Sequence, residues 1–103
     1  MGHEETRLRR LMAAEVGVIR SGAGIARALA EISAIETKAR TTALKDMTIA
    51  ALMIAAAAYA RTESRGAHYR SDFPAPDPAQ AQRSYFTLDE ARAVARRAGA
   101  KAA

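Results

Sequence analysis

Cysteine and tryptophan are absent from this sequence of 103 residues, and histidine occurs only twice. A chain without cysteine has no disulfide, no thiolate metal ligand and no cysteine nucleophile. His3 and His68 are too few for a metal site built from several imidazoles. The absence of cysteine is also typical of a reducing compartment, so we expect a cytoplasmic protein that binds no metal.

Signatures of several other protein classes are missing as well. The sequence has no G-x-G-x-x-G after a strand, no G-x-x-x-x-G-K-[ST] and no H-E-x-x-H. The glycine-rich residues 21–24 stand between two predicted helices, so they indicate a helix break rather than a phosphate-binding loop. The apolar run 49–60 has twelve residues, whereas a membrane span needs about 20, so we expect a core helix and no membrane span.

Positive charge exceeds negative charge, with 16 lysines and arginines against 11 acidic residues. Such an excess is typical of nucleic-acid-binding proteins when the cations gather on one surface. Here the basic residues are spread along the chain and alternate with acids, and no aromatic residues stand between them to stack on bases. We therefore expect a solvated helical surface and no nucleic-acid partner.

Alanine is abundant, and apolar residues recur with the period of an α-helix. We predict an all-α single domain over residues 1–103. Its predicted parts are a cloning remnant at 1–3, a three-helix bundle resembling a spectrin repeat at 4–66, an extended Pro-rich arm at 67–86 and a short helix at 87–98. The helices of the bundle are expected at 4–20, 23–40 and 43–65.

Each of the first two predicted helices carries one apolar stripe that is expected to face the core. In the first helix the stripe consists of Leu8, Leu11, Met12, Val16 and Ile19. In the second helix it consists of Ile25, Ala28, Leu29, Ile32 and Ile35.

Capping residues mark the predicted helix ends. The N-terminal caps are Ser21 or Gly22, Thr41 or Thr42, and the capping box of Thr87 with Glu90. Gly66 is expected to end the third helix as a left-handed residue. Glu36 and Arg40 are four positions apart, so we expect an ion pair between them on the exposed face of the second helix.

The third predicted helix is apolar on nearly all sides. Leu44 and Ile54 lie on one face, while Ile49 and Leu52 lie on another. A helix of this kind must be covered on nearly all sides, either by another molecule or by the arm and last helix folding back. The arm and last helix supply few large side chains, so we expect the isolated chain to self-associate.

Residues 61–74 hold most of the candidate chemistry, since seven of these fourteen residues are Arg, Glu, Asp, His or Tyr. In one interpretation, Glu63 and Asp72 pair with neighbouring arginines and fix the exit of the chain from the bundle. In the other, an arginine holds a carboxylate and His68 moves a proton. We favour the first, because ion networks often form without catalysing anything. The residues of this motif are Glu63, Ser64, Arg65, Gly66, His68, Arg70 and Asp72.

The segment 63–74, ESRGAHYRSDFP, resembles the signature in the C-terminal domain of the fumarate reductase, succinate dehydrogenase and L-aspartate oxidase flavoproteins. The upstream stretches 8–12 and 16–25, with Ala28 and Leu29, look most like the L-aspartate oxidases. The alternatives are the same domain of a succinate dehydrogenase or fumarate reductase subunit, and a free-standing basic helical adaptor.

The resemblance implies a role within a larger enzyme. L-aspartate oxidases hold FAD in an N-terminal Rossmann-like domain, close a capping domain over the substrate and end in a helical domain. They oxidise L-aspartate to iminoaspartate for the synthesis of quinolinate and NAD. The dinucleotide fingerprint and the substrate-binding residues of that family have no match in this sequence. The resemblance therefore implies a chain without catalytic or FAD-binding residues, whose motif has a structural role toward the FAD and capping domains of a parent enzyme.

Overall fold

The computed structural model describes residues 3–82 and 86–102, with side chains described as far as Gly99. Its elements are the α-helices α1 (His3–Glu15), α2 (Gly22–Lys38), α3 (Thr42–Ala60) and α4 (Leu88–Ala102), and the short 3-10 helix η1 (Pro78–Gln80). Over these residues the chain forms isolated β-bridges but no strand. The predicted all-α class is therefore confirmed.

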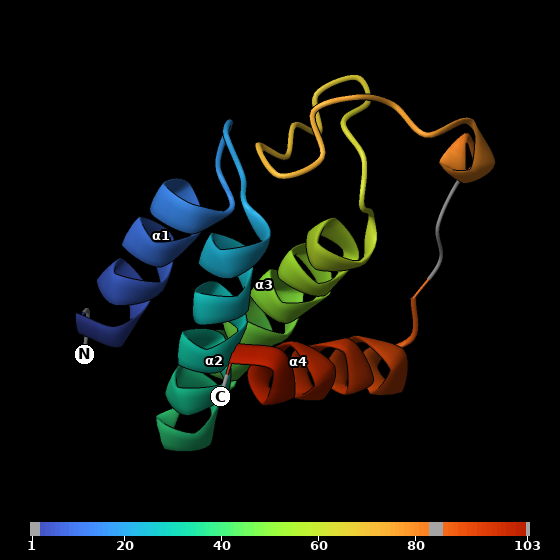
Figure 1. The fold of residues 1–103 in the computed structure, drawn as a ribbon. Coiled ribbons are helices and arrows are strands. Elements are labelled where there is room, and N and C mark those ends of the chain that lie inside the picture. Colours follow the sequence, from blue (N-terminus) through green and yellow to red (C-terminus); the bar gives the residue numbers. More distant parts are fainter. Residues whose placement is uncertain (1–2, 83–85, 103) are drawn as a thin grey trace.

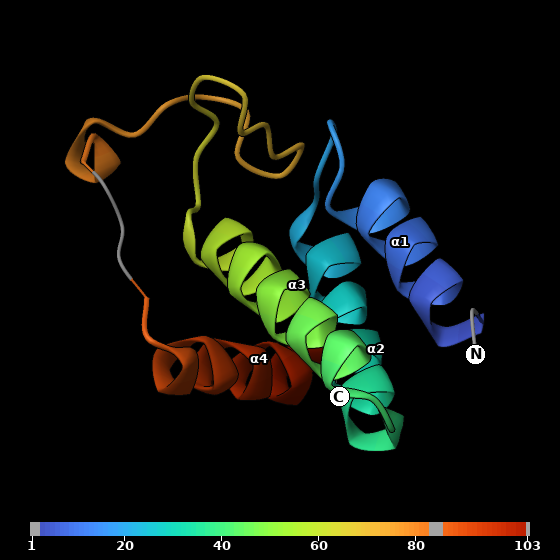
Figure 2. The same ribbon diagram turned by 180° about the vertical axis from the view of Figure 1, so that it is seen from behind.

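The helices are arranged around the pair α2 and α3 (Figures 1 and 2). α1 contacts both members of this pair on one side, and α4 crosses both of them on the other. The last helix thus folds back onto α3. This was one of the two ways in which the sequence allowed the third helix to be covered. The resemblance to a spectrin repeat is not confirmed, because four helices share the core instead of three.

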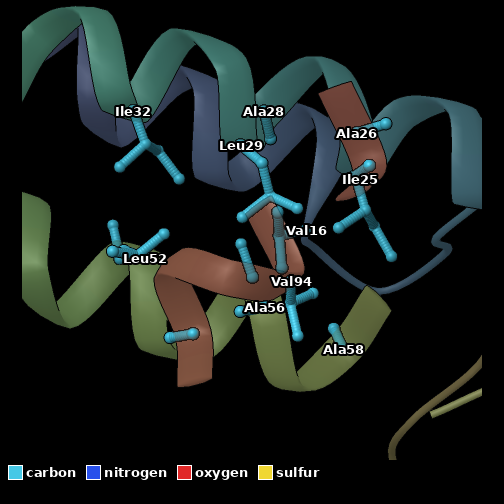
Figure 3. Packing of buried hydrophobic residues seen from close by; sticks show 14 of the residues in the cluster. Val16, Ile25, Ala26, Ala28, Leu29, Ile32, Leu52, Ala56, Ala58 and Val94 are labelled. Atoms are coloured by element: carbon cyan, nitrogen blue, oxygen red, sulfur yellow. The ribbon is translucent and has the colours of Figure 1, made fainter. Parts of the chain in front are cut away.

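The core combines aliphatic side chains from α2 with small side chains from α3 and α4, and Leu8 and Val16 complete it from the side of α1 (Figure 3). All five residues of the predicted α2 stripe, Ile25, Ala28, Leu29, Ile32 and Ile35, are buried. α3 and α4 contribute mainly alanine, together with Leu52 and Val94. Because alanine adds only a methyl group, it allows the helix backbones to approach closely while costing no rotamer entropy.

The predicted caps are present. Ser21 Oγ accepts a hydrogen bond from the backbone N–H of Gly24 at 3.1 Å, and Thr41 Oγ1 accepts one from Leu44 at 3.1 Å. Before α4, the N–H of Thr87 donates to Glu90 Oε1 at 2.8 Å, and the N–H of Glu90 donates to Thr87 Oγ1 at 3.1 Å. These bonds satisfy backbone donors that have no partner within the helix.

The first helix ends at Glu15, five residues earlier than predicted. Beyond it the chain turns so tightly that a Cβ on Gly17 would lie 2.4 Å from the carbonyl oxygen of Ala13, so this turn requires glycine. The prediction that Ile19 faces the core is therefore wrong, since its side chain lies outside the helix and is 68% exposed. Leu8 and Val16, from the same predicted stripe, are buried.

The third helix also ends early, at Ala60 instead of Arg65. Gly66 has the left-handed conformation expected, with φ of 57°, but it does not follow a helix. It occupies a turn closed by two backbone hydrogen bonds between Arg65 and His68, of 2.7 and 2.9 Å. The arm that follows is not simply extended: it folds back on itself and forms η1, while its residues 83–85 lie outside the described part.

Two further predictions are wrong at the other end of the molecule. α4 continues through Gly99 to Ala102, whereas we expected it to end near Ala98. Glu36 pairs with Arg92 of α4 through two contacts of 2.8 Å, and not with Arg40. The pair follows from the docking of α4 on α2, which sequence spacing within one helix cannot reveal.

By length and composition alone, α3 is apolar enough to cross a membrane, with 19 residues and a hydropathy of 1.4 over its apolar window. This is weak evidence, because core helices of water-soluble proteins satisfy the same criterion. In this structure α3 lies against α1, α2 and α4.

Candidate functional site

The residues that the sequence singled out gather where α2 begins and α3 ends. The chain after α3 turns back toward the α1–α2 loop, so that two segments far apart in sequence lie side by side (Figure 1). The N–H of Arg20 donates to the carbonyl of Tyr69 at 3.1 Å, and the N–H of Ser71 donates to the carbonyl of Arg20 at 2.6 Å. We call the side chains around this contact, Arg20, Arg61, Glu63, Ser64, Arg65, His68, Arg70 and Asp72, the polar clamp.

Arg70 is the buried centre of the polar clamp. Its Nη1 donates to the carbonyl oxygens of Ala58 at 3.1 Å and Tyr59 at 2.6 Å, which belong to the last turn of α3. The guanidinium also lies 5.6 Å from the centre of the Tyr59 ring and 5.1 Å from that of Phe73. A cation at this position satisfies carbonyls that have no helical partner and interacts favourably with the dipole of α3.

Asp72 extends this contact to α2. Its two oxygens accept from Arg70 Nε at 3.0 Å and Nη2 at 2.8 Å, and Oδ2 also accepts from the N–H of Gly22 at 3.0 Å. The hydrogen bonds from Arg70, and to a smaller extent its charge and the Gly22 amide, hold the pKa of Asp72 below its ordinary value. The pair therefore joins the C-terminal end of α3 to the N-terminal end of α2. The cation of Arg70 lies at the negative end of the α3 dipole, and the anion of Asp72 lies at the positive end of the α2 dipole, so both interactions are favourable.

Gly22 is required for this arrangement. A Cβ at this position would lie 2.6 Å from Asp72 Oδ2 and 2.8 Å from Arg70 Nη2. The amides at the start of α2 are also engaged, since Gly22 donates to Asp72 and Gly24 donates to Ser21. The glycine-rich stretch is thus a helix start whose donors already have acceptors within the chain.

Glu63 anchors the arm to the end of α3. Its carboxylate has no exposed surface and accepts from Arg65 Nε at 3.2 Å, from Arg61 Nη1, and from the N–H of Asp77 at 2.7 Å. The Glu63 carboxylate nevertheless lies close to solvent, because the Arg65 side chain that covers it is itself 41% exposed. The hydrogen bond from Arg65 is the main cause that lowers the pKa of Glu63 to about 2, with contributions from the Asp77 amide and Arg61.

Ser64 and Arg65 hold the loop that follows them. Ser64 Oγ accepts from the N–H of Arg70 at 2.9 Å and donates to the carbonyl of Phe73 at 2.8 Å, while Arg65 Nη2 donates to the carbonyl of Asp77 at 3.1 Å. The Ser64 hydroxyl thereby adds side-chain hydrogen bonds to the few backbone bonds that close this loop.

His68 connects the α1–α2 loop to the exit of α3. Arg20 Nη1 lies 2.6 Å from His68 Nδ1, and His68 Nε2 lies 3.1 Å from the carbonyl of Arg61. Since a guanidinium only donates, Nδ1 accepts and the proton is assigned to Nε2, which donates to the carbonyl. Burial, and then the charges of Arg20, Arg70 and Arg61, lower the pKa of His68. The imidazole thus links the α1–α2 loop to the end of α3 through both of its ring nitrogens.

The structure brings all seven motif residues together, and every charged side chain among them meets a partner within the chain. Such pairing within the chain is what the structural interpretation requires. Over residues 3–82 and 86–102, no group of three or more His, Asp or Glu side chains is placed to hold a metal ion. Sequence reasoning did not assign Arg20 or Gly22 to the motif. Gly22 was named only as a possible cap, and both residues lie in the stretch 16–25 that resembles the L-aspartate oxidases.

Comparison with known proteins identifies the family of this chain. The family of fumarate reductase flavoprotein C-terminal domains matches residues 37–97, which is more than half of the chain and includes the whole motif. The chain belongs to this family.

Among individual proteins, the chain is similar to L-aspartate oxidases. It is 54% identical to the one from Rhodospirillum rubrum over 89 residues, which are 86% of this chain and 32% of that protein. It is 44% identical to the one from Caulobacter vibrioides over 82 residues, 80% of this chain and 15% of that protein. An uncharacterized FAD-dependent oxidoreductase of Methanocaldococcus jannaschii is 37% identical over 79 residues, 65% of this chain and 15% of that protein.

The chain thus spans a third or less of the length of these relatives. No solved structure matches it significantly.

Proposed function

We propose that this chain is the C-terminal helical domain of an L-aspartate oxidase, an FAD enzyme that oxidises L-aspartate to iminoaspartate for the synthesis of quinolinate and NAD. The observation that carries the proposal is the 54% identity to the Rhodospirillum rubrum oxidase over 86% of the chain. The domain acts by supporting the geometry of the flavin and capping domains on which hydride transfer depends. It works in the cytoplasm and binds no nucleic acid.

We infer that the isolated chain neither catalyses the reaction nor holds FAD. FAD binding requires backbone donors free to receive a pyrophosphate. The donors at the glycine-rich start of α2 are engaged by Asp72 and Ser21, and Gly22 has side-chain atoms where a ligand would approach. After dialysis with FAD, the isolated chain should retain no flavin absorbance near 450 nm, roughly the band of any oxidised flavin. Stoichiometric yellow protein would contradict this.

The experiment for the function itself is a graft. The C-terminal segment of the Caulobacter oxidase that matches this chain is replaced by the chain, and the same replacement is made in a fumarate reductase flavoprotein subunit. We expect the oxidase graft to retain FAD and to reduce it with L-aspartate, and the reductase graft to lose its flavin. An oxidase graft that loses FAD would overturn the proposal. Equal success in the reductase would favour the alternative, a domain of that subunit.

We further propose that the isolated chain self-associates through α3. α4 covers one side of α3, but Ile54 remains 54% exposed in a groove that it shares with Met12 of α1 and Met47. A two-fold contact between identical patches is the simplest cover for such a groove. Light scattering should show a mass that rises with concentration, and less so for Ile54→Ser. A monomer at every concentration would contradict this.

A further inference from the structure

Large apolar side chains are exposed mainly at one end of the molecule. Val18 is 84% and Ile19 68% exposed in the α1–α2 loop, and Tyr69 and Phe73 are each 41% exposed in the motif that pairs with this loop. Over the described side chains, only one other large apolar residue, Ile54, is classed as exposed. We call Val18, Ile19, Tyr69 and Phe73 together the apolar tip. The two segments that carry it, the α1–α2 loop and the loop after α3, pair through the β-bridge of Arg20 with Arg70, and both lie toward the top of Figure 1.

The loop that carries Val18 and Ile19 is held on both sides. Before it, Gly17 packs against the carbonyl of Ala13 at the end of α1. After it, Arg20 donates from its Nε to the Gly17 carbonyl at 3.0 Å and from its backbone to Tyr69. Apolar side chains on a fixed loop lose little conformational entropy when they are covered, which is typical of a binding surface and not of a loop exposed by chance.

The motif side of the apolar tip is equally fixed. The Phe73 carbonyl accepts from Ser64, and its ring lies over the buried Arg70 guanidinium. Tyr69 is held by its backbone to Arg20. The polar clamp therefore serves two purposes: it joins helix ends, and it presents aromatic and aliphatic side chains outward from a rigid frame.

We propose that the apolar tip is the surface on which the flavin-binding body of the same polypeptide docks. This rests on the proposed function. The 82 matched residues are 15% of the Caulobacter relative, so roughly 460 of its residues lie outside the match. A body of that size has a radius of gyration of about 23 Å. The described chain begins at the far end of α1, about 20 Å from the tip for a helix of 13 residues, which is within reach of such a body.

The flavin-binding body and a second copy of the chain could both cover the apolar tip, and the covalent connection favours the flavin-binding body. A tethered domain is present at an effective concentration in the millimolar range, far above that of a second copy in solution. The apolar tip is therefore covered within one polypeptide, while the groove at Ile54 is left for association of the isolated chain.

The test uses the Caulobacter graft described above, with Val18→Ser/Ile19→Ser as the variant. In the graft we expect amide hydrogen exchange at Val18 and Ile19 to be about tenfold slower than in the isolated chain. The double variant should lower the temperature at which the graft releases FAD, yet leave the unfolding temperature of the isolated chain unchanged, because both side chains are exposed there. Ile54→Ser is the matched control and should leave FAD release unchanged.

The outcomes separate the two proposals. A graft without substitutions that does not retain FAD rejects the proposed function, whatever the variants do. A graft that retains FAD, but whose FAD release is insensitive to Val18→Ser/Ile19→Ser, keeps the function and overturns the docking surface. If Ile54→Ser lowers the release temperature instead, the groove between α1 and α3 is the docking face and the proposal for the tip is wrong.

Discussion

The core between α2, α3 and α4 and the polar clamp beyond the ends of α2 and α3 lie next to each other but contain different kinds of side chain. In the core, aliphatic side chains such as Leu29 and Ile32 pack against alanine. In the clamp, the buried Arg70 and Glu63 each hold several partners through hydrogen bonds. The core depends on volume and the clamp on specific donors and acceptors, so they should respond differently to substitution, salt and pH.

The largest difference is expected at Arg70. Its replacement by alanine leaves the last carbonyls of α3 without their donor and removes the cation between the Tyr59 and Phe73 rings, while the Asp72 carboxylate, 39% exposed, loses its partner but stays in contact with water. We expect a loss of about 3–5 kcal/mol in the free energy of unfolding, mostly from the two buried carbonyls. Urea titration of the isolated chain measures it. Arg70→Lys keeps the positive charge but loses the planar guanidinium that donates to both oxygens of Asp72. This variant should therefore be less stable than the unsubstituted chain and more stable than Arg70→Ala. A loss below about 1 kcal/mol would mean that the clamp adds little.

A core substitution should cost slightly less and behave differently. Leu29→Ala removes a buried side chain facing α3 and α4, which should lower the free energy of unfolding by about 3 kcal/mol. Since no charge is involved, this loss should be the same at low and high salt, whereas the loss from Arg70→Ala should vary with salt. Equal salt dependence of the two variants would remove the distinction between core and clamp.

Gly66 tests the backbone of the clamp. No atom lies within 4 Å of a Cβ placed there, so Gly66→Ala should act only through the left-handed φ of 57°. We expect a loss of about 1 kcal/mol in the free energy of unfolding, and less for Gly66→Asn, which tolerates this conformation better. If alanine and asparagine had equal effects, the turn would not constrain φ.

The smallest effect is expected for the ion pair between Glu36 and Arg92. Its geometry is bidentate like that of Arg70 with Asp72, but the Arg92 side chain is 38% exposed. Arg92→Ala should therefore lower the free energy of unfolding by only about 0.5 kcal/mol. A loss as large as that for Arg70→Ala would show that burial is not what distinguishes the clamp.

The sequence could predict those features that depend on residues close to one another in the chain. The buried stripe of α2 and the capping box of Thr87 are local patterns that were predicted correctly. Ser21 and Thr41 were each predicted as one of two possible caps, and they are the residues that cap α2 and α3. The all-α class and the family also followed from local composition and from the motif 63–74.

The early ends of α1 and α3 were not predicted, and residues just beyond α1 make contacts that are distant in sequence. Arg20 leaves the helical pattern and bonds to His68, 48 positions away, and Gly22 bonds to Asp72, 50 positions away. Glu36 prefers Arg92, 56 positions away, to its helical neighbour Arg40. The motif residues were identified by their density of charge, but their partners required the fold.

The pH dependence of unfolding tests most directly whether the polar clamp is a structural element. The pKa of Glu63 is about 2 in the folded chain against an ordinary value of 4.5. A lowered pKa means that its contribution is present above pH 4.5 and is lost as the pH falls toward 2. Asp72 and Glu36, whose pKa values are also lowered, lose theirs in acid too, so Glu63→Gln should retain part of the dependence.

The measurement is the free energy of unfolding of the isolated chain and of Glu63→Gln, by urea titration from pH 6 to pH 2. The account predicts that the unsubstituted chain is the more stable at pH 6, and that the two curves converge as the pH falls below about 4.5. Parallel curves over the whole range would show that the Glu63 carboxylate gains nothing from Arg61, Arg65 and the Asp77 amide, and would contradict the account.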